Sequence, residues 1–355
     1  MSKQIVHKNN KIELGLLSRS SFNLLLTTKY KDSKKIVIVD ENTQEECWPF
    51  VLTTFEALSD AEVIVLPSGE KNKVMEVCFQ VWEAFTNYHI QRNDLVINLG
   101  GGVVTDMGGF IASVYKRGLD FINIPTTLLA MVDASVGGKN GINLGAHKNQ
   151  LGVFSAPEIT VCDSAFLQTL DPKELLSGKA EMIKHGLIAS APFFNDLIKD
   201  KNEIPSEKLI EAAIQIKSDI VDRDYKEQGE RKKLNFGHTV GHSIEGYLLE
   251  KEVEITHGEC VAWGILVESY LSHELAGLPE KELERIESLI RKLYPVLSFT
   301  EAEFKPLLQL MRHDKKNQGD KINFTLLNAI GESKIDYLLD EEQIVEALIK
   351  VFILS

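Results

Sequence analysis

A chain of 355 residues is longer than one hydrophobic core usually supports, so two domains are expected. The formal net charge of −13 argues against nucleic acid and anionic lipid as main partners. Four scattered cysteines without a CxxC pair, an N-terminus without a signal-peptide pattern and no apolar run of roughly 18 residues indicate a cytoplasmic protein, with neither a disulfide framework nor a membrane span.

Short apolar runs in the first half predict a parallel sheet covered on both faces. They comprise residues 36–39, 63–66, 95–99, 121–124 and 159–162. Turn-forming or polar residues follow each run, and near-continuous Val, Ile and Leu are typical of buried parallel strands. Between the second and third runs, apolar residues at steps of three and four predict a helix over 73–88.

From about Pro172 the pattern becomes helical. Helices are expected from Ser206 onward, over 261–276 and over 280–293, with short strand-like runs at 323–327 and 334–338. The predicted fold is an N-terminal Rossmann-like α/β domain, residues 1–168, followed by a mostly helical metal- and substrate-binding domain, residues 169–355. Ligands are expected outside the carboxyl ends of the strands.

A glycine-rich segment, residues 98–109, follows the third predicted strand and opens a helix. Glycines and free helix N–H groups can hold a pyrophosphate, but the strict dinucleotide pattern fails because Thr105 stands where its third glycine belongs. Nucleotide binding and a tight, closely packed turn therefore remain equal alternatives. Asp40, after the first strand, could bind a ribose hydroxyl or serve as a turn residue.

Residues 133–149 are dense in glycine and polar side chains, which predicts a long ordered loop. Lys139 and Lys148 could hold a phosphate there as point charges. The alternative is a solvated surface loop whose lysines serve no ligand.

Histidines suggest a metal site in the second half. His238 and His242 are four residues apart, which puts them on one side of a helix, and His257 and the upstream Glu181 add two more donors. Spacing alone favours His238 and His242 as a ligand pair, by analogy with HExxH sites. Alternatively, each histidine caps a helix or satisfies a core hydrogen bond.

Several motifs together carry a family resemblance. They are Gly100-Gly101-Gly102 with Asp106, the 133–149 segment, Glu181 with Lys184, and Asn235-Phe236-Gly237-His238-Thr239 with His242. With these motifs in order between about Val63 and Ile330, the chain resembles the 3-dehydroquinate synthase family of the shikimate pathway. The wider superfamily contains other sugar phosphate cyclases and metal-dependent polyol dehydrogenases, which are the alternative activities.

The resemblance implies a divalent ion, zinc or cobalt, held by Glu181, His238 and His257. His242 is then a catalytic or supporting histidine, against the spacing argument. Substrate contacts are implied for Arg117, Asp133, Lys139, Asn149, Lys184, Lys217, Arg231 and Asn235, with Glu227 positioning the cations and either Lys315 or Lys316 reaching the phosphate.

NAD is the second implied cofactor. The resemblance implies contacts from Asp40, Asn42, Ser68, Gly69, Glu70, Lys73, Gly101, Gly102, Val103, Val104, Thr105, Asp106, Thr126, Thr127, Lys139, Lys148, Phe166, Leu167, Gln168 and Thr169. Small departures from the family pattern are Ser68 where many members carry aspartate, Lys173 where arginine is usual, and extra residues at 250–254.

The implied reaction converts 3-deoxy-D-arabino-heptulosonate 7-phosphate into 3-dehydroquinate and phosphate, with NAD taking and returning a hydride, in a homodimeric enzyme. Local lysines and arginines would let this acidic protein bind an acidic substrate. A non-catalytic relative built on a decayed enzyme would lack ligands or cations, and none is missing from the sequence.

Overall fold

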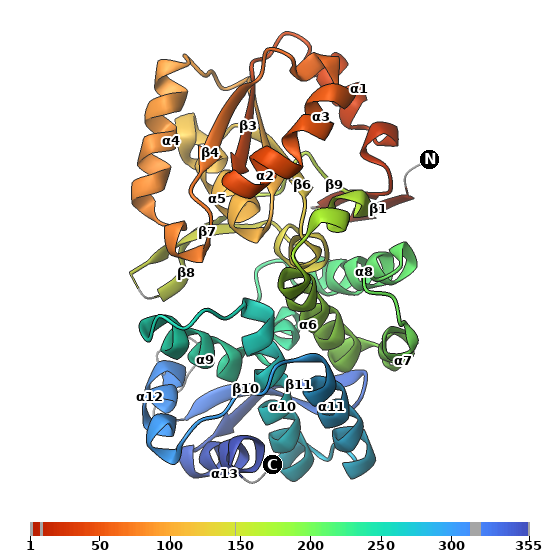
Figure 1. Cartoon of the computed structure of the whole chain (residues 1–355), viewed down its shortest axis with the longest axis vertical. Coiled ribbons are helices and arrows are strands. Elements are labelled where there is room, and N and C mark those ends of the chain that lie inside the picture. Colours follow the sequence, from red (N-terminus) through yellow and green to blue (C-terminus); the bar gives the residue numbers. More distant parts are fainter. Residues whose placement is uncertain (1–2, 8–9, 146, 313–320, 354–355) are drawn as a thin grey trace. The chain divides into compact units, whose positions relative to one another are not determined.

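The computed structural model describes residues 3–7, 10–145, 147–312 and 321–353. The chain forms two compact units, drawn together in Figure 1. The first comprises Met1–Asp171 and Lys217–Asp222, and the second Pro172–Ile216 and Arg223–Ser355. The short segment Lys217–Asp222, which the sequence pattern assigns to the helical domain, therefore groups with the first unit.

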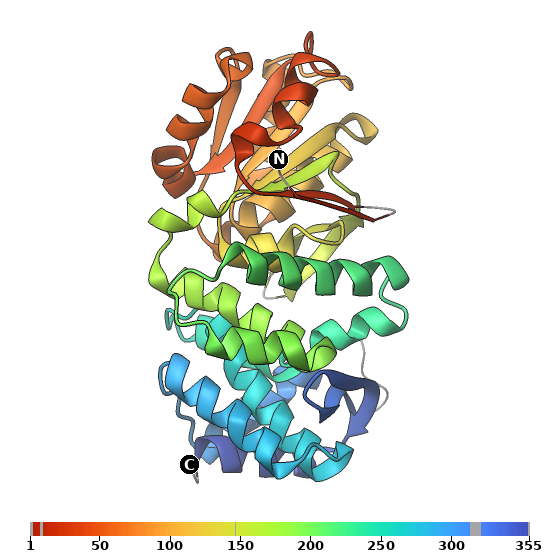
Figure 2. The same ribbon diagram turned by 90° about the vertical axis from the view of Figure 1, so that its right-hand side faces the viewer.

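The first unit is built on a seven-stranded sheet, as far as the chain is described, with strand order β1-β2-β9-β6-β5-β3-β4. The strands are β1 (Lys3–His7), β2 (Asn10–Leu14), β3 (Lys35–Asp40), β4 (Glu62–Leu66), β5 (Leu95–Gly100), β6 (Asp120–Pro125) and β9 (Ile159–Cys162). All neighbours pair in parallel except β1 and β2, whose antiparallel ribbon forms one edge of the sheet (Figure 2). The five predicted strands are confirmed.

Burial explains why the central strands are continuous in apolar residues. Every residue of β5 is buried, and so are the four apolar residues of β3. Helices α4 (Met75–Asn87) and α5 (Gly102–Val114) pack against these strands in one core cluster that includes Phe85, Phe110 and Phe121. The remaining helices of this unit are α1 (Phe22–Thr27), α2 (Glu41–Glu46) and α3 (Trp48–Thr54).

The predicted loop over residues 133–149 is wrong. A short π-helical turn, Ala130–Ala134, precedes an antiparallel hairpin of β7 (Lys139–Leu144) and β8 (His147–Phe154). The hairpin is anchored because Ile142, fully buried, joins the core cluster around α5. Tertiary packing has thus given a glycine-rich, polar segment a regular structure that its composition does not predict.

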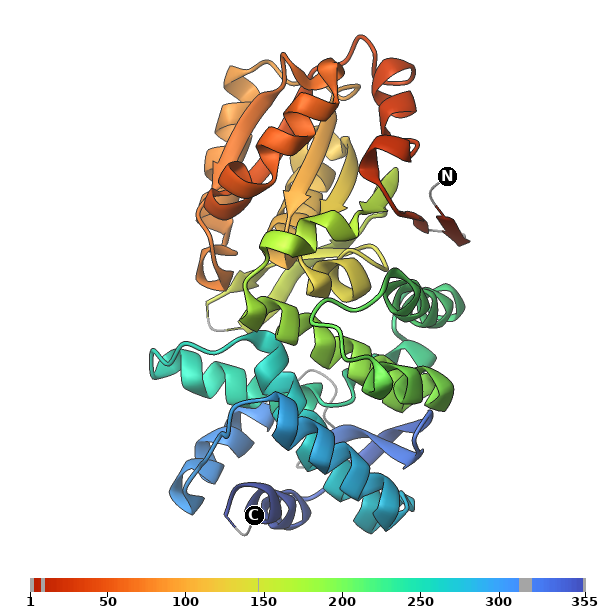
Figure 3. The same ribbon diagram turned by 45° about the vertical axis from the view of Figure 1, so that its right-hand side comes forward.

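The second unit is mostly helical, as expected. Its helices are α6 (Pro172–Ala189), α7 (Ala191–Lys199), part of α8 (Glu207–Arg223), α9 (His238–Glu250), α10 (His257–Ala276), α11 (Glu280–Leu293), α12 (Glu301–Arg312) and α13 (Glu341–Phe352), with the hairpin β10 (Ile322–Ala329) and β11 (Glu332–Leu339). Helix α10 packs against α6, α9, α11, α13 and β10 and is the core of this unit (Figure 3).

All four cysteines are buried as free thiols. Burial raises the pKa of the Cys47, Cys78 and Cys162 thiols to about 12, so they stay protonated at neutral pH. None of the helices described is long and apolar enough to cross a bilayer.

Candidate metal centre and ligand-binding residues

Two histidines stand at the first positions of neighbouring helices in the second unit: His238 begins α9 and His257 begins α10. The two helices cross closely because Gly237 and Gly264 meet at the crossing. A Cβ on Gly264 would lie 2.0 Å from the Gly237 carbonyl oxygen, and Gly237 has a φ of +79°, which favours glycine. The glycine flanking the histidine motif thus brings the start of α9 against α10.

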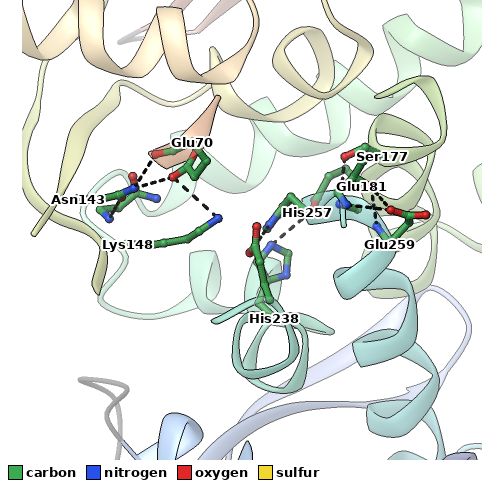
Figure 4. A network of polar contacts seen from close by, with 12 residues as sticks. Glu70, Asn143, Lys148, Ser177, Glu181, His238, His257 and Glu259 are labelled. Carbon is green, nitrogen blue, oxygen red and sulfur yellow. Dashed lines mark hydrogen bonds and ion pairs between the residues drawn. The ribbon is translucent and has the colours of Figure 1, made fainter. Parts of the chain in front are cut away.

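Glu181 of α6 faces both histidines (Figure 4). Its Oε1 atom lies 3.4 Å from His238 Nε2 and 3.6 Å from His257 Nε2. The carboxylate is fully buried, and among the described residues neither of its oxygens accepts a hydrogen bond of ordinary geometry. The Lys184 ammonium forms a close ion pair with the other oxygen, Oε2, so Oε1 is the oxygen that faces the two rings. A buried carboxylate is stable when positive charge surrounds it.

The opposite ring nitrogens fix which tautomer each histidine adopts. His238 Nδ1 lies 3.2 Å from the Phe236 carbonyl oxygen, and His257 Nδ1 lies 3.1 Å from Glu245 Oε2. Both partners can only accept, so each Nδ1 carries the hydrogen and each neutral ring turns a lone pair on Nε2 toward Glu181. Three lone pairs therefore converge on one point.

This donor set fits a divalent ion. Ligand atoms about 2.0–2.1 Å from a tetrahedral Zn²⁺ lie roughly 3.3–3.4 Å apart, close to the distances between Glu181 and the two rings. Burial and the nearby Lys184 ammonium lower the pKa of His238, which keeps it neutral. Although burial raises the pKa of Glu181, Lys184 and His238 hold it well below its usual range. Deprotonated ligands are what a metal requires.

His242, on the solvent-exposed side of α9, joins the same group. Donor atoms of His238, His242 and His257 all lie within 4.8 Å of one another, and the His242 ring centroid is 5.1 Å from that of His238. The structure thus brings together all four residues singled out from the sequence. Both the spacing-based pair and the Glu181-containing set are compatible with its geometry.

Lys184, an implied substrate contact, is buried, and its ammonium forms a close ion pair with Glu181. Three further implied residues meet in the loop before α9. Asn235 donates to Glu227 Oε1 at 3.1 Å, and Arg231 donates to the Tyr225 carbonyl oxygen at 2.6 Å.

Asp224 shapes that loop. Its carboxylate accepts the backbone N–H groups of Gln228, Gly229 and Arg231, and these bonds lower its pKa against the opposing effect of burial. The loop also holds Glu227 at a φ of +59°. The loop backbone and the hydrogen bond from Asn235 therefore both hold Glu227 in place.

In the first unit, Lys73 joins implied cofactor and substrate residues. Its ammonium lies 2.6 Å from Asp106 Oδ2 and donates to Asn149 Oδ1 at 2.7 Å. Asn143 continues the network, because it accepts the Asn149 N–H and donates to Glu70. Lys148 Nζ lies 3.8 Å from the same Glu70 oxygen (Figure 4).

The glycine-rich segment has two different roles. Gly101 and Gly102 form the start of α5 directly after β5, where free N–H groups can face an anion. Gly108 and Gly109 instead make room for neighbours: a Cβ on either would lie 1.9 Å from the side-chain oxygen of Asn98 or Asn140, respectively. Close packing, one of the two alternatives for this segment, thus describes Gly108 and Gly109, while nucleotide binding at Gly101 and Gly102 stays a prediction.

Val103, Val104, Thr105 and Asp106 lie in the first turns of α5, and Thr126 and Thr127 follow β6, where Thr126 donates to the Gly100 carbonyl oxygen. Ser68 donates to the Glu41 carboxylate and lies near Asn42. Asp40 caps α2 by accepting from Thr43 at 2.8 Å, so its turn role is present. Phe166 and Leu167 are buried, while Gln168 and Thr169 are exposed.

The remaining implied residues are spread more widely. Lys217 contacts Asp133 in the first unit, with Nζ 2.7 Å from Oδ1 and 2.6 Å from the backbone oxygen. Lys139 is an exposed residue at the start of β7. Arg117 is exposed in the turn between the end of α5 and β6, with a φ of +71°. Lys315 and Lys316 lie outside the described residues.

The sequence analysis did not single out Glu245, whose carboxylate contacts His257. It lies seven residues after His238, which is two turns along the same face of α9. That spacing is a usable signal for a carboxylate supporting a histidine ligand.

Solved structures of other proteins share this fold. A 2-epi-5-epi-valiolone synthase from Streptomyces hygroscopicus subsp. jinggangensis, solved with NAD⁺ and Zn²⁺ bound, is 26% identical, with a TM-score of 0.81 over 98% of both chains. A 2-deoxy-scyllo-inosose synthase solved with carbaglucose-6-phosphate, NAD⁺ and Co²⁺ shares the fold at 21% identity, a TM-score of 0.81 and coverage of 99% of this chain and 100% of its own. The protein thus has the fold of the sugar phosphate cyclases.

Sequence comparison identifies the family. Residues 63–177 match the 3-dehydroquinate synthase N-terminal family model and residues 178–317 the C-terminal one. A 3-dehydroquinate synthase from Parabacteroides distasonis is 43% identical over 350 residues, 98% of this chain and 96% of that protein, and one from Thermoanaerobacter pseudethanolicus is 38% identical over 326 residues, 88% and 89% of the two chains. The chain belongs to the 3-dehydroquinate synthase family of phosphate lyases.

Proposed function

We propose that the chain converts 3-deoxy-D-arabino-heptulosonate 7-phosphate into 3-dehydroquinate and phosphate, using NAD and one divalent ion, zinc or cobalt. Family membership supports the activity. The observation that carries the proposal is the convergence of Glu181, His238 and His257 on one point, with lone pairs facing inward. Alcohol oxidation, phosphate elimination, ketone reduction, ring opening and an intramolecular aldol step then follow with no net redox change.

When bound, the ion would supply Lewis-acid stabilisation of negative charge on oxygen, and NAD would supply a reversible hydride acceptor. The residues of the chain supply proton transfer and binding. His242, exposed beside the ligand set, relays the alcohol proton. Glu181, His238 and His257 hold the ion, as their burial and tautomers favour.

Local cations neutralise the phosphate of the substrate. We assign this role to Lys139, Lys184, Lys217 and Arg231, with Asn149, Asn235, Arg117, Lys315 or Lys316 as further contacts and Asp133 bonded to the polyol. Glu227 is assigned to positioning, consistent with its bond from Asn235. Elimination, ring opening and aldol closure then need chiefly an oriented substrate and little water.

The NAD site is assigned to the carboxyl ends of the strands in the first unit. The start of α5, the Lys73–Asp106 pair and the turn that carries Glu70 support this assignment, because they combine free N–H groups with fixed charges. We further propose a cytoplasmic homodimer. Free buried thiols fit a reducing compartment, and sedimentation of the purified protein tests the oligomeric state.

The reaction itself is tested by incubating the protein with the heptulosonate phosphate, NAD and Co²⁺ or Zn²⁺. Phosphate release and dehydroquinate formation without net NADH are expected. Stoichiometric NADH would identify a polyol dehydrogenase instead. Turnover of a different sugar phosphate in preference to this one would identify another cyclase.

A further inference from the structure

Helices α9 and α10 are tied to each other by two buried carboxylates in a reciprocal arrangement. Glu268, on α10, contacts the backbone at the start of α9. Glu245, on α9, contacts His257, the first residue of α10. Each helix therefore supplies a carboxylate that holds the histidine-bearing end of the other.

Glu268 completes the N-terminus of α9 from outside the helix. Its Oε2 accepts the Gly237 N–H at 2.7 Å and its Oε1 accepts the Val240 N–H at 3.2 Å. These are the two N–H groups that a capping box satisfies within a helix. Gly237 at the cap and Val240 three residues later have no side chain able to do so, which leaves this task to Glu268.

Glu268 can contact the start of α9 because α9 and α10 cross closely at Gly237 and Gly264. Glu268 is fully buried, and Gly264 lies one turn before it on α10. Since a Cβ on Gly264 would lie 2.0 Å from the Gly237 carbonyl oxygen, a side chain there would push the start of α9 away from Glu268. The crossing thus sets the position of His238, the residue next to Gly237.

Glu245 acts on His257 directly. Its Oε2 lies 3.1 Å from His257 Nδ1, and the side chain is 6% exposed. By accepting the Nδ1 hydrogen it fixes the ring orientation and keeps the Nε2 lone pair directed at Glu181, 3.6 Å away. His238 has a neutral carbonyl in the equivalent place, whereas His257 has the carboxylate of Glu245.

We propose that Glu245 and Glu268 are positioning residues that set the geometry of the metal centre, Glu245 through the tautomer of His257 and Glu268 through the position of His238. This inference rests on the proposed metal-dependent function. It predicts that conservative changes at either position weaken metal binding in the absence of NAD and substrate, beyond any effect on folding.

The test measures the affinity of the full-length, metal-stripped protein for Zn²⁺ and Co²⁺ by competition with a chromophoric chelator. We expect Glu245→Gln and Glu268→Gln each to weaken binding about 10- to 100-fold, and to change the d–d absorption of bound Co²⁺ at saturation. Thermal unfolding of the metal-free variants is measured in parallel. Glu303→Gln is the matched control, because Glu303 accepts from Tyr247 and Lys251 toward the other end of α9.

Unchanged affinity and unchanged Co²⁺ spectra in both variants would overturn the proposal while leaving the metal centre intact. An equal loss of metal affinity in Glu303→Gln would also overturn the proposal, because metal affinity would then follow overall stability and not the geometry of the metal centre. If the unsubstituted protein bound no divalent ion, the proposed function and this inference would both fail. Should Glu268→Gln not fold, Glu245→Gln and Glu245→Asp decide the outcome, with Glu245→Asp retaining more affinity than Glu245→Gln.

Discussion

Lys73, which is buried, and Asp106, which is partly buried, form an ion pair in the first unit, with 2.6 Å between Nζ and Oδ2. Burial raises the pKa of Asp106 above its usual value, and Lys73 opposes that rise. Replacing the lysine leaves a mostly buried carboxylate without its nearest positive charge, a change that costs about 3–5 kcal/mol when burial is complete and less for a partly exposed group. We expect Lys73→Met to lower the free energy of unfolding by an amount of this order at neutral pH, measured by urea denaturation.

The direction of the Asp106 pKa shift determines how the loss of stability in Lys73→Met depends on pH. A carboxyl whose folded pKa lies above its unfolded one destabilises the fold as pH rises through the folded pKa. Without Lys73 that pKa rises further, so the difference between Lys73→Met and the parent should be largest near neutral pH and shrink toward pH 4. The exposed neighbour Lys71→Met is the control. A difference that grew on acidification would contradict this account.

Measuring the bound metal of alanine variants distinguishes the three proposed ligands from the neighbouring His242. Glu181→Ala, His238→Ala and His257→Ala are each expected to lose bound metal and turnover together, because each removes one of the converging donors. His242→Ala should keep about one equivalent of metal and lose turnover. Mass spectrometry of dialysed protein measures the metal. A full equivalent of bound metal in any of the first three variants would remove that residue from the ligand set. Loss of the bound metal in His242→Ala would add His242 to it.

Lys148→Ala should impair activity and leave the metal in place. Lys148 Nζ lies 3.8 Å from Glu70, among residues assigned to the cofactor. A charged hydrogen bond from this lysine to the bound cofactor would contribute about 1.5–3 kcal/mol, so kcat/KM should fall roughly 10- to 100-fold. The control is the exposed Lys31→Ala. Wild-type kinetics in Lys148→Ala would exclude this lysine from both ligand sites.

The helix crossing can be tested by adding one methyl group. Gly264→Ala would place Cβ 2.0 Å from the Gly237 carbonyl oxygen. Overpacking of this kind costs about 1–3 kcal/mol, and metal affinity should fall as well. Gly246→Ala on α9 is the matched control, because its Cβ would meet only Leu310, at 3.6 Å. It should be neutral or stabilising; equal stability of the two variants would argue against the close crossing.

Glu303 provides an acid-dependent contribution to stability. The Thr300 N–H is the largest cause, followed by the Tyr247 hydroxyl, and together they lower the pKa of Glu303 from 4.5 to about 2. A depressed carboxyl pKa stabilises the fold above the unfolded value and ceases to do so as pH falls through about 2. Glu303→Gln should therefore destabilise by about 1 kcal/mol at pH 7, with the gap closing below pH 4. If the difference in unfolding free energy between Glu303→Gln and the parent did not change with pH, ionisation of Glu303 would not be its cause.

The strands of the first unit were predictable because buried parallel strands need continuous apolar residues, as in residues 95–99. Two other elements of this unit were not predictable from the sequence. The ribbon β1–β2 is short and partly polar, so its sequence resembles surface chain. The hairpin β7–β8 depends on Ile142 reaching a core formed by distant elements. Helix α10 begins at His257 rather than at 261, and the capping box of Thr256 and Glu259 was the available signal.

Spacing alone could pair His238 with His242, because both lie on one helix. It could not bring in Glu181 and His257, since their approach depends on how α6, α9 and α10 cross. Family resemblance supplied that information, and the geometry is compatible with it. Asp40 illustrates the opposite case: its sequence position suits a ribose contact, yet the turn role that was the alternative is the one the hydrogen bonds describe.

The concealed thiols have a practical consequence for spectroscopy. Maleimide and methanethiosulfonate reagents attack thiolates, and buried sulfur atoms whose pKa is near 12 offer almost none at neutral pH. The natural chain is therefore close to an unreactive background. Fluorophores or spin labels could be attached at introduced surface cysteines, on either unit, without first deleting any native one.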